Sequence, residues 1–508
     1  MLKHILSVGG WTLVSRVTGF VRDVVIAAVM GVGPVADAFV VALRLPNHFR
    51  AIFGEGAFNA AFVPAYARAR ETKGPADAQK FADRVFTLML AVQVALLAAA
   101  FAGMPWVVRL LAPGFAENPE KFALAVTLTR ITFPYLLFVT LVTLLSGLLN
   151  AHERFAAAAA APVLLNVAMV AALALAFLFP TAGHAAAYGV AAAGVLEFLL
   201  VWIDARRAGI APSLGRPRLD ETLKGFFKAL GPAVVGSAGI QIAMFADTII
   251  ASFLPTGAVS SLYYADRLYQ LPVGVIGIAA GTVLLPEMSR RLAAGDAAGA
   301  HGAQNRALGF TLALAAPFAV AFLIVPDLIM AALFRRGAFD LAAAERAGAV
   351  LAAYAIGLPA VVLIRSAVAS FYARSDTLTP VIAALVAVAV NVALKLVLTR
   401  PFGVVGLALA TAAGAWVNVA LLFGLAYRRD WTAPSATLGK VLAAVAAASL
   451  ILALYTVLAQ APVARLVAPL VAWRDETALA VLALGGALAY GLALLAGLKL
   501  LGVRLQRA

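Results

Sequence analysis

The sequence lacks cysteine and has little charge. None of its 508 residues is cysteine, so disulfide bonds and thiolate metal sites are excluded, and the redox compartment cannot be inferred from cysteine usage. Charged residues make up 12% of the chain, whereas an ordinary soluble domain has roughly a quarter. Hydrophobic residues make up 64%. A soluble fold of this length could not bury so much apolar surface, so the composition predicts a membrane protein.

Apolar runs recur along the whole chain, each long enough to cross a hydrocarbon core of roughly 30 Å as a helix. A transmembrane β-barrel is excluded, because its strands alternate apolar and polar residues, whereas 156–179 and 442–458 are apolar on every side. The sequence therefore predicts an all-α polytopic membrane protein. We expect about fourteen spans, near 5–30, 35–66, 85–111, 122–150, 157–180, 184–204, 224–254, 259–289, 305–333, 343–372, 379–399, 403–427, 436–460 and 477–502.

The formal net charge of +15 does not indicate nucleic-acid binding, because the basic residues are scattered between apolar runs rather than gathered on one face. Their placement instead predicts topology. The loops on one side are much richer in basic residues, which include Arg68, Arg70, Lys73, Lys80, Arg84, Arg206, Arg207, Arg216, Arg218 and Lys224. By the positive-inside rule these loops are cytoplasmic, and an even number of spans then places both termini in the cytoplasm.

A weak internal repeat predicts the domain organisation. Residues 45–70 and 271–292 each begin with LP, continue through a Gly-bearing stretch and reach a second Pro before basic residues. This predicts two pseudo-symmetric six-helix lobes around a central cavity, at 1–209 and 210–429, and two further helices in 430–508. A chance match of two proline-containing helices is the alternative.

Ionisable side chains inside the predicted spans are the candidate functional residues, because each costs about 2.5–3.5 kcal/mol to insert at the centre of a membrane helix. The candidates are Arg16, Arg22, Asp37, Arg50, Glu55 and Arg267. Arginine is always ionised and binds phosphate oxygens two at a time, which favours an anionic ligand such as a pyrophosphate. Ion pairs between helices are the structural alternative. No metal cluster, nucleophile motif or nucleotide loop is apparent, so no cofactor or metal is predicted.

Eight segments, spread along the chain, carry a recognisable pattern: SRVTGFVRD at 15–23, ADAFVVALRLPNHFRAIFGEGAFNAAFVP at 36–64, LAPGF at 111–115, RITFPYLLF at 130–138, LNAHERFAAAAAAPVLLN at 149–166, YYADRLYQLPVGVIGIAAGTVLLP at 263–286, LFRRGAFD at 333–340 and FYARSDTLTP at 371–380. Together these segments resemble the MurJ/MviN family of lipid II flippases, within the superfamily of multidrug, oligosaccharidyl-lipid and polysaccharide exporters. The resemblance implies a flippase that moves the undecaprenyl-pyrophosphate-linked peptidoglycan precursor to the outer leaflet of the bacterial cytoplasmic membrane by alternating access.

The resemblance also implies roles for individual residues. Arg16, Arg22, Asp37, Arg50, Glu55 and Arg267 all match family positions, whereas Gln270 stands where some relatives have a glutamate. The last two helices resemble those thought to shelter the lipid tail. Some members bind sodium in the second lobe, and Asp247, Asn391 and Thr411 match that arrangement. Lys395 replaces an acidic ligand there, so we expect it to pair with Asp247 in place of the ion.

Two other classes of function, a membrane enzyme and a different exporter, are alternatives to a lipid II flippase. A membrane glycosyltransferase or polymerase needs positioned carboxylates or a sizeable extramembrane domain, and the loops are mostly too short to build one. Another exporter of the same superfamily is a closer competitor, against which the segments quoted above argue. The resemblance also suggests peptidoglycan synthases as partners. The sequence does not identify the energy source of transport.

Overall fold

The computed structural model describes residues 2–52, 58–216, 221–470 and 472–503, and all regular structure in these ranges is helical. This confirms the predicted all-α fold. Nine helical segments in the described part of the chain are long and apolar enough to cross a membrane. Each predicted span coincides with one helix or with two consecutive helices. The chain is therefore a polytopic helical membrane protein.

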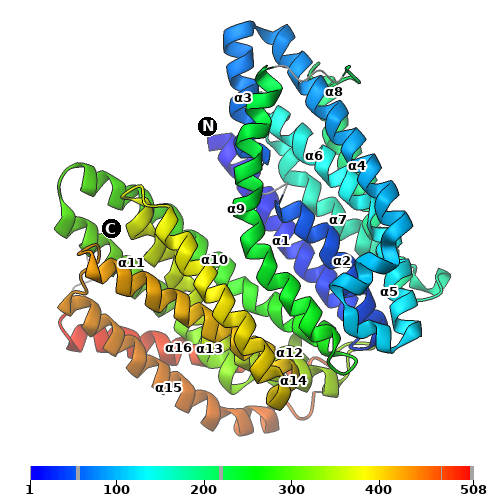
Figure 1. The fold of residues 1–508 in the computed structure, drawn as a ribbon. Coiled ribbons are helices and arrows are strands. Elements are labelled where there is room, and N and C mark those ends of the chain that lie inside the picture. Colours follow the sequence, from blue (N-terminus) through cyan, green and yellow to red (C-terminus); the bar gives the residue numbers. More distant parts are fainter. Residues whose placement is uncertain (1, 53–57, 217–220, 471, 504–508) are drawn as a thin grey trace. The chain divides into compact units, whose positions relative to one another are not determined.

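The chain forms two compact units, residues 1–260 and 261–508, which we describe separately. The helices of the first unit are labelled in Figure 1. They are α1 (Leu2–Met30), α2 (Pro34–Ile52), α3 (Phe58–Lys73), α4 (Pro75–Leu111), α5 (Pro119–Thr132), α6 (Pro134–Ala151), α7 (Ala156–Ala174), α8 (Ala182–Arg207) and α9 (Glu221–Ser252), with short 3-10 helices at Pro113–Glu117 and Ala176–Leu178.

Proline and glycine explain where the predicted spans are interrupted. The span expected at 122–150 is divided into α5 and α6 at Pro134, which lacks an amide hydrogen and is favoured in the first turn of a helix. In the second unit, the spans expected at 379–399 and 403–427 form one element, α14. This element has non-helical backbone angles at Gly403, where φ is 55°. The two segments of α14 are therefore separate helices joined by a sharp bend.

An aromatic cluster ties α9 to the earlier helices of its unit. Phe226 of α9 is buried and forms T-shaped pairs with Phe58 and Phe81, at 5.6 and 6.1 Å between ring centroids. Phe62 stacks on Phe58 at 5.3 Å between ring centroids. Such offset and edge-to-face pairs add stability beyond the area they bury. The compact unit therefore extends through α9, while the repeat-based lobes at 1–209 and 210–429 stay a prediction.

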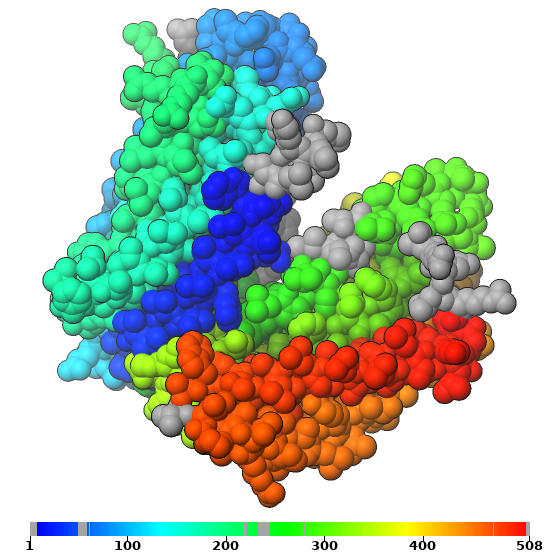
Figure 2. Space-filling model, turned by 180° about the vertical axis from the view of Figure 1, so that it is seen from behind, coloured from blue at the N-terminus to red at the C-terminus, as the bar shows by residue number. Residues whose placement is uncertain are grey.

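The second unit contains α10 (Ala258–Ala293), most of which lies beyond residue 260, and the remaining helices. These are α11 (Ala297–Ile324), α12 (Pro326–Phe334), α13 (Leu341–Tyr372), α14 (Leu378–Arg428), α15 (Ala436–Leu466) and α16 (Arg474–Leu500). Figure 2 shows α15 and α16 side by side on the surface of this unit, in orange and red. Their exposed faces carry leucines such as Leu450 and Leu484, about 70% exposed, as expected of helices that face lipid.

Ion pairs fasten the start of α16 to the turn after α12. Arg335 lies 2.8 Å from the Asp475 carboxylate, and Arg336 lies 2.7 Å from the Glu476 carboxylate. Asp475 and Glu476 occupy the first turn of α16, where negative charge also interacts favourably with the helix dipole. These ion pairs therefore hold the beginning of α16, one of the two helices predicted beyond the lobes, against the residues that follow α12.

Candidate functional site

Arg22 is buried on α1 and is held by two neighbours. Its Nε and Nη2 donate to Oδ1 of Asp23 at 3.0 and 2.7 Å, and Nη1 donates to Oδ1 of Asn166 at 3.0 Å. The amide of Asn166, on α7, in turn donates to the Ser15 carbonyl and the Thr18 hydroxyl, both at 3.0 Å. The predicted phosphate-binding arginine is therefore part of a hydrogen-bond network that joins α1 to α7.

Arg16 lies six residues before Arg22 on α1 and has an exposed side chain. Among the described residues it makes no ion pair with any carboxylate. The predicted alternative, in which interior arginines serve only as partners of interior carboxylates, therefore fits Arg22 better than Arg16. The two arginines share one helix but differ in their surroundings. Hydrogen bonds to Asp23 and Asn166 hold the Arg22 guanidinium, whereas the Arg16 side chain is exposed.

Asp37 is almost completely buried near the start of α2, at 1% exposure. Its Oδ2 accepts from the Lys121 ammonium of α5 at 2.7 Å and from the Gly257 amide at 2.8 Å. Its Oδ1 accepts from the amide and the hydroxyl of Ser260, at 2.9 and 2.8 Å. Four donors thus converge on one carboxylate, which neutralises the lysine and caps the amino end of α10.

Gly257 is required in the turn before α10. Its φ of +97° is rarely adopted by residues with a side chain, and a Cβ there would lie 2.7 Å from Val32. The glycine therefore allows the turn to approach the α1–α2 connection closely enough for its amide to reach Asp37. The Lys121 ammonium also lies 4.1 Å from the centroid of the Phe115 ring, a distance at which the ring face attracts a cation.

In the second unit, Arg267 is half-buried on α10, and its guanidinium lies 4.7 Å from the centroid of the Tyr263 ring. Asn391 and Lys395 are buried on the first segment of α14, and Lys395 is 1% exposed. The Asn391 amide donates to the carbonyl of Ala410 at 3.3 Å, next to Thr411 on the second segment. Asn391 thus contacts the second segment of α14 at the residue before Thr411, while a shared ion-coupling role for these residues stays a prediction.

Two predicted site residues lie partly or wholly outside the described residues. The backbone of Arg50 lies in α2, but its side chain is outside the described residues, as is the whole of Glu55. Asp247 is half-buried on α9 in the first unit, whereas Lys395 belongs to the second. The pairing of Asp247 with Lys395 and the convergence of the arginines on one cavity therefore stay predictions.

Sequence reasoning missed Lys121, Asn166 and Ser260. Asn166 was detectable, because an asparagine in an apolar helix needs partners for its amide. Lys121 looked like an ordinary loop residue, and only the turn formed by the Asn118 cap and Pro119 aims it inward. Nothing local in the sequence distinguishes Ser260 from other serines at helix starts.

Comparisons with known proteins decide the family. A family model described as "Lipid II flippase MurJ" matches residues 26–471. The chain belongs to the MurJ family of lipid II flippases. It is 45% identical over 437 residues to a "Probable lipid II flippase MurJ" of Rhizobium meliloti (strain 1021), covering 85% of this chain and 82% of the relative. It is 36% identical over 430 residues to the "Lipid II flippase MurJ" of Burkholderia cenocepacia, covering 83% of each.

The solved structures agree with this assignment. A structure entitled "Lipid II flippase MurJ, inward closed conformation" matches with a TM-score of 0.80 and 25% identity, over 97% of this chain and 98% of that one. An inward-facing multidrug resistance MATE transporter of the MOP superfamily matches with a TM-score of 0.70 at 16% identity, over 82% and 94%, which shows a shared fold alone. Membership of the MurJ family makes the chain a transporter rather than an enzyme.

The Asp37 cluster generates a prediction about stability. Asp37→Ala and Lys121→Met should each lower the free energy of unfolding by about 3–5 kcal/mol, because each leaves the other charge buried without its partner. The double variant should cost less than the sum of the two, as measured by thermal unfolding of the purified protein in detergent. Asp77 and Lys80 form an exposed pair at 2.9 Å in the same unit and are the matched control. Their coupling should be much weaker, because water screens an exposed ion pair. Equal coupling in the two pairs would contradict this account of Asp37.

Proposed function

We propose that this chain moves lipid II from the cytoplasmic to the outer leaflet of the bacterial cytoplasmic membrane by alternating access. The observation that carries the proposal is the MurJ family match over 26–471, together with interior arginines in the helices where the family resemblance expects them. A transporter of this kind alternates between states that bind the substrate differently. Depleting a resident flippase tests the proposal, since expression of this chain should restore growth and lipid II export.

The proposed substrate contact is a set of guanidinium groups on the pyrophosphate, from Arg16, Arg22, Arg50 and Arg267. Two observations support it. Arg16 is exposed on α1 without an ion pair in the described part of the chain, and Arg22 is held in a fixed orientation by Asp23 and Asn166. An oriented guanidinium loses less side-chain freedom on binding than a mobile one. In this proposal Arg22 provides a fixed contact and Arg16 an adaptable one.

Asp37 has a different place in the proposal. The sequence predicts that Asp37 belongs to the substrate site, yet the described partners of Asp37 are Lys121 and the start of α10. We therefore assign Asp37 the role of holding the α9–α10 turn against α2 and α5, so that it acts on transport through helix position. Peptidoglycan synthases remain proposed partners, supported only by the need for an acceptor of exported lipid II.

The arginine proposal predicts a specific outcome for conservative substitution. Arg→Lys at positions 16, 22, 50 and 267 should impair complementation nearly as much as Arg→Ala, because lysine keeps the charge but loses the planar two-pronged contact. Growth and lipid II export are measured at matched protein abundance. Arg206→Lys, an exposed loop-proximal change, is the control. Normal export by all four lysine variants would exclude bidentate phosphate binding.

The Asp247–Lys395 proposal predicts sodium-independent transport, because a tethered ammonium already neutralises the buried carboxylate. Asp247→Asn and Lys395→Met should each reduce transport, and the double variant should transport better than either single one. The measurement is lipid II export in cells, with and without sodium in the medium. A steep sodium dependence, or a double variant no better than the singles, would overturn the pairing.

The proposed topology places both termini and the loops at 65–84 and 205–223 in the cytoplasm. Leu214→Cys introduces the sole cysteine at a side chain that is 72% exposed. An impermeant thiol reagent should label this variant only after the membrane is permeabilised. Phe402→Cys, 53% exposed in a predicted outer loop, should be labelled in intact cells. The reverse pattern would invert the topology.

A further inference from the structure

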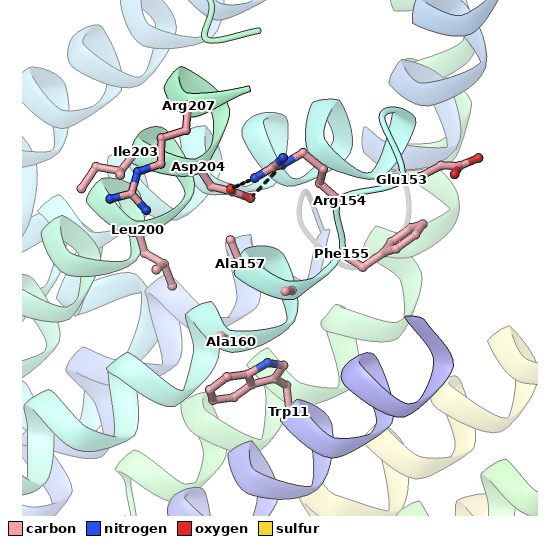
Figure 3. A pocket seen from close by; sticks show the side chains of 11 residues that line it. Trp11, Glu153, Arg154, Phe155, Ala157, Ala160, Leu200, Ile203, Asp204 and Arg207 are labelled. Carbon is pink, nitrogen blue, oxygen red and sulfur yellow. Dashed lines mark hydrogen bonds and ion pairs between the residues drawn. The ribbon is translucent and has the colours of Figure 1, made fainter. Parts of the chain in front are cut away.

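A hollow of about 560 Å³ lies in the first unit at one end of α7 and α8, and none of the predicted site residues lines it. Figure 3 shows Trp11 of α1 on one side and the end of α8, with Asp204 and Arg207, on the opposite side. Between them runs the 153–160 segment, which leads into α7. Because α7 begins where α8 ends, the hollow lies at a single end of both helices.

Small side chains create the space. Residues 156–161 are six consecutive alanines, and Ala157 and Ala160 line the hollow. Methyl groups at these positions leave room that larger side chains would fill. The other walls are apolar as well, because Leu200, Ile203 and the Trp11 indole line them. An apolar hollow of this size can hold part of a hydrocarbon chain.

Two arginines and two carboxylates line the hollow, and they are not equally paired. Arg154 forms an ion pair with Asp204, and the side-chain hydrogen bond to Asp204 raises the pKa of the Arg154 guanidinium. Glu153 points away from the hollow in Figure 3. Arg207 has no ion pair with any carboxylate in the described part of the chain. One cationic side chain that lines the hollow is therefore left without a carboxylate partner.

The start of α7 adds to this positive potential. Its N-cap residue, Phe155, provides no side-chain hydrogen bond to the first turn. First-turn amides without a cap attract anions, and the helix dipole acts in the same direction. Both α7 and α8 satisfy the length and composition of membrane spans, so the hollow lies where the chain enters and leaves the bilayer. Tryptophan is enriched at this depth, where headgroups meet hydrocarbon.

We propose that the hollow binds an anionic phospholipid of the surrounding bilayer. The headgroup phosphate lies between Arg207 and the start of α7, and part of an acyl chain lies against Trp11, Leu200 and Ile203. An anionic end and an apolar end are both needed to match these walls, which favours a phospholipid over free phosphate. The bound lipid is a resident of the site rather than cargo, so the proposal does not depend on the transport of lipid II.

Native mass spectrometry of the delipidated full-length protein tests the proposal with phosphatidylglycerol and phosphatidylcholine of identical chains. Wild type should retain phosphatidylglycerol preferentially, and Arg207→Gln should weaken that binding about tenfold, as expected for loss of a charged hydrogen bond. Arg206→Gln is the matched control, because Arg206 is adjacent in sequence but lines a different hollow, with Phe86 and Trp202. This control should bind like wild type.

A second pair of variants tests the apolar part. Ala157→Leu should fill the hollow and reduce phosphatidylglycerol binding, whereas Ala158→Leu adds the same volume at a residue that does not line it and should have little effect. Equal retention of the two phospholipids by wild type, or equal loss in the Arg206 and Arg207 variants, would overturn the proposal. Displacement of the lipid by millimolar inorganic phosphate would assign a phosphate site instead. Loss of lipid II retention in Arg207→Gln, with phosphatidylglycerol retention unchanged, would assign the hollow to the substrate.

Discussion

A charged group inside a membrane protein has to find its partners within the protein, because hydrocarbon offers none. Asp37 shows how much structure this constraint organises. Its two oxygens receive donors from α5, from the turn before α10 and from the first turn of α10, so one side chain fixes three separate segments. Replacing any one donor leaves a buried charge with fewer partners. The position of α2 against its neighbours therefore depends on this carboxylate.

The same constraint explains why the predicted site residues differ in the structure. Arg22 has an adjacent carboxylate and an asparagine from α7, whereas the Arg16 side chain is exposed and makes no ion pair among the described residues. Both are arginines of one helix, and both are proposed substrate contacts. A protein that must bind an anionic lipid and then release it benefits from such unequal partners, because a guanidinium satisfied within the protein competes less strongly for the substrate.

The fold was predictable from the sequence, because the length of each apolar run and the positions of prolines determine where each helix begins and ends. Spans ended at Pro and Gly much as expected, and the division of 122–150 at Pro134 follows from the missing amide hydrogen alone. The site was only partly predictable. Interior charges such as Arg22 and Asp37 stood out, but Lys121 and Ser260 lie 84 and 223 residues from Asp37 and meet it only through packing. No local pattern encodes a contact of that range.

The order of synthesis adds a consequence to the Arg22 network. Asp23 leaves the ribosome directly after Arg22, whereas Asn166 follows 144 residues later. At synthesis rates of about 5–20 residues per second, that interval is roughly 7–30 seconds. During insertion Arg22 therefore has a neutralising neighbour on its own helix before α7 exists. Asp37 has no charged residue beside it in the sequence, and its ion-pair partner Lys121 is synthesised only 84 residues later, as part of α5.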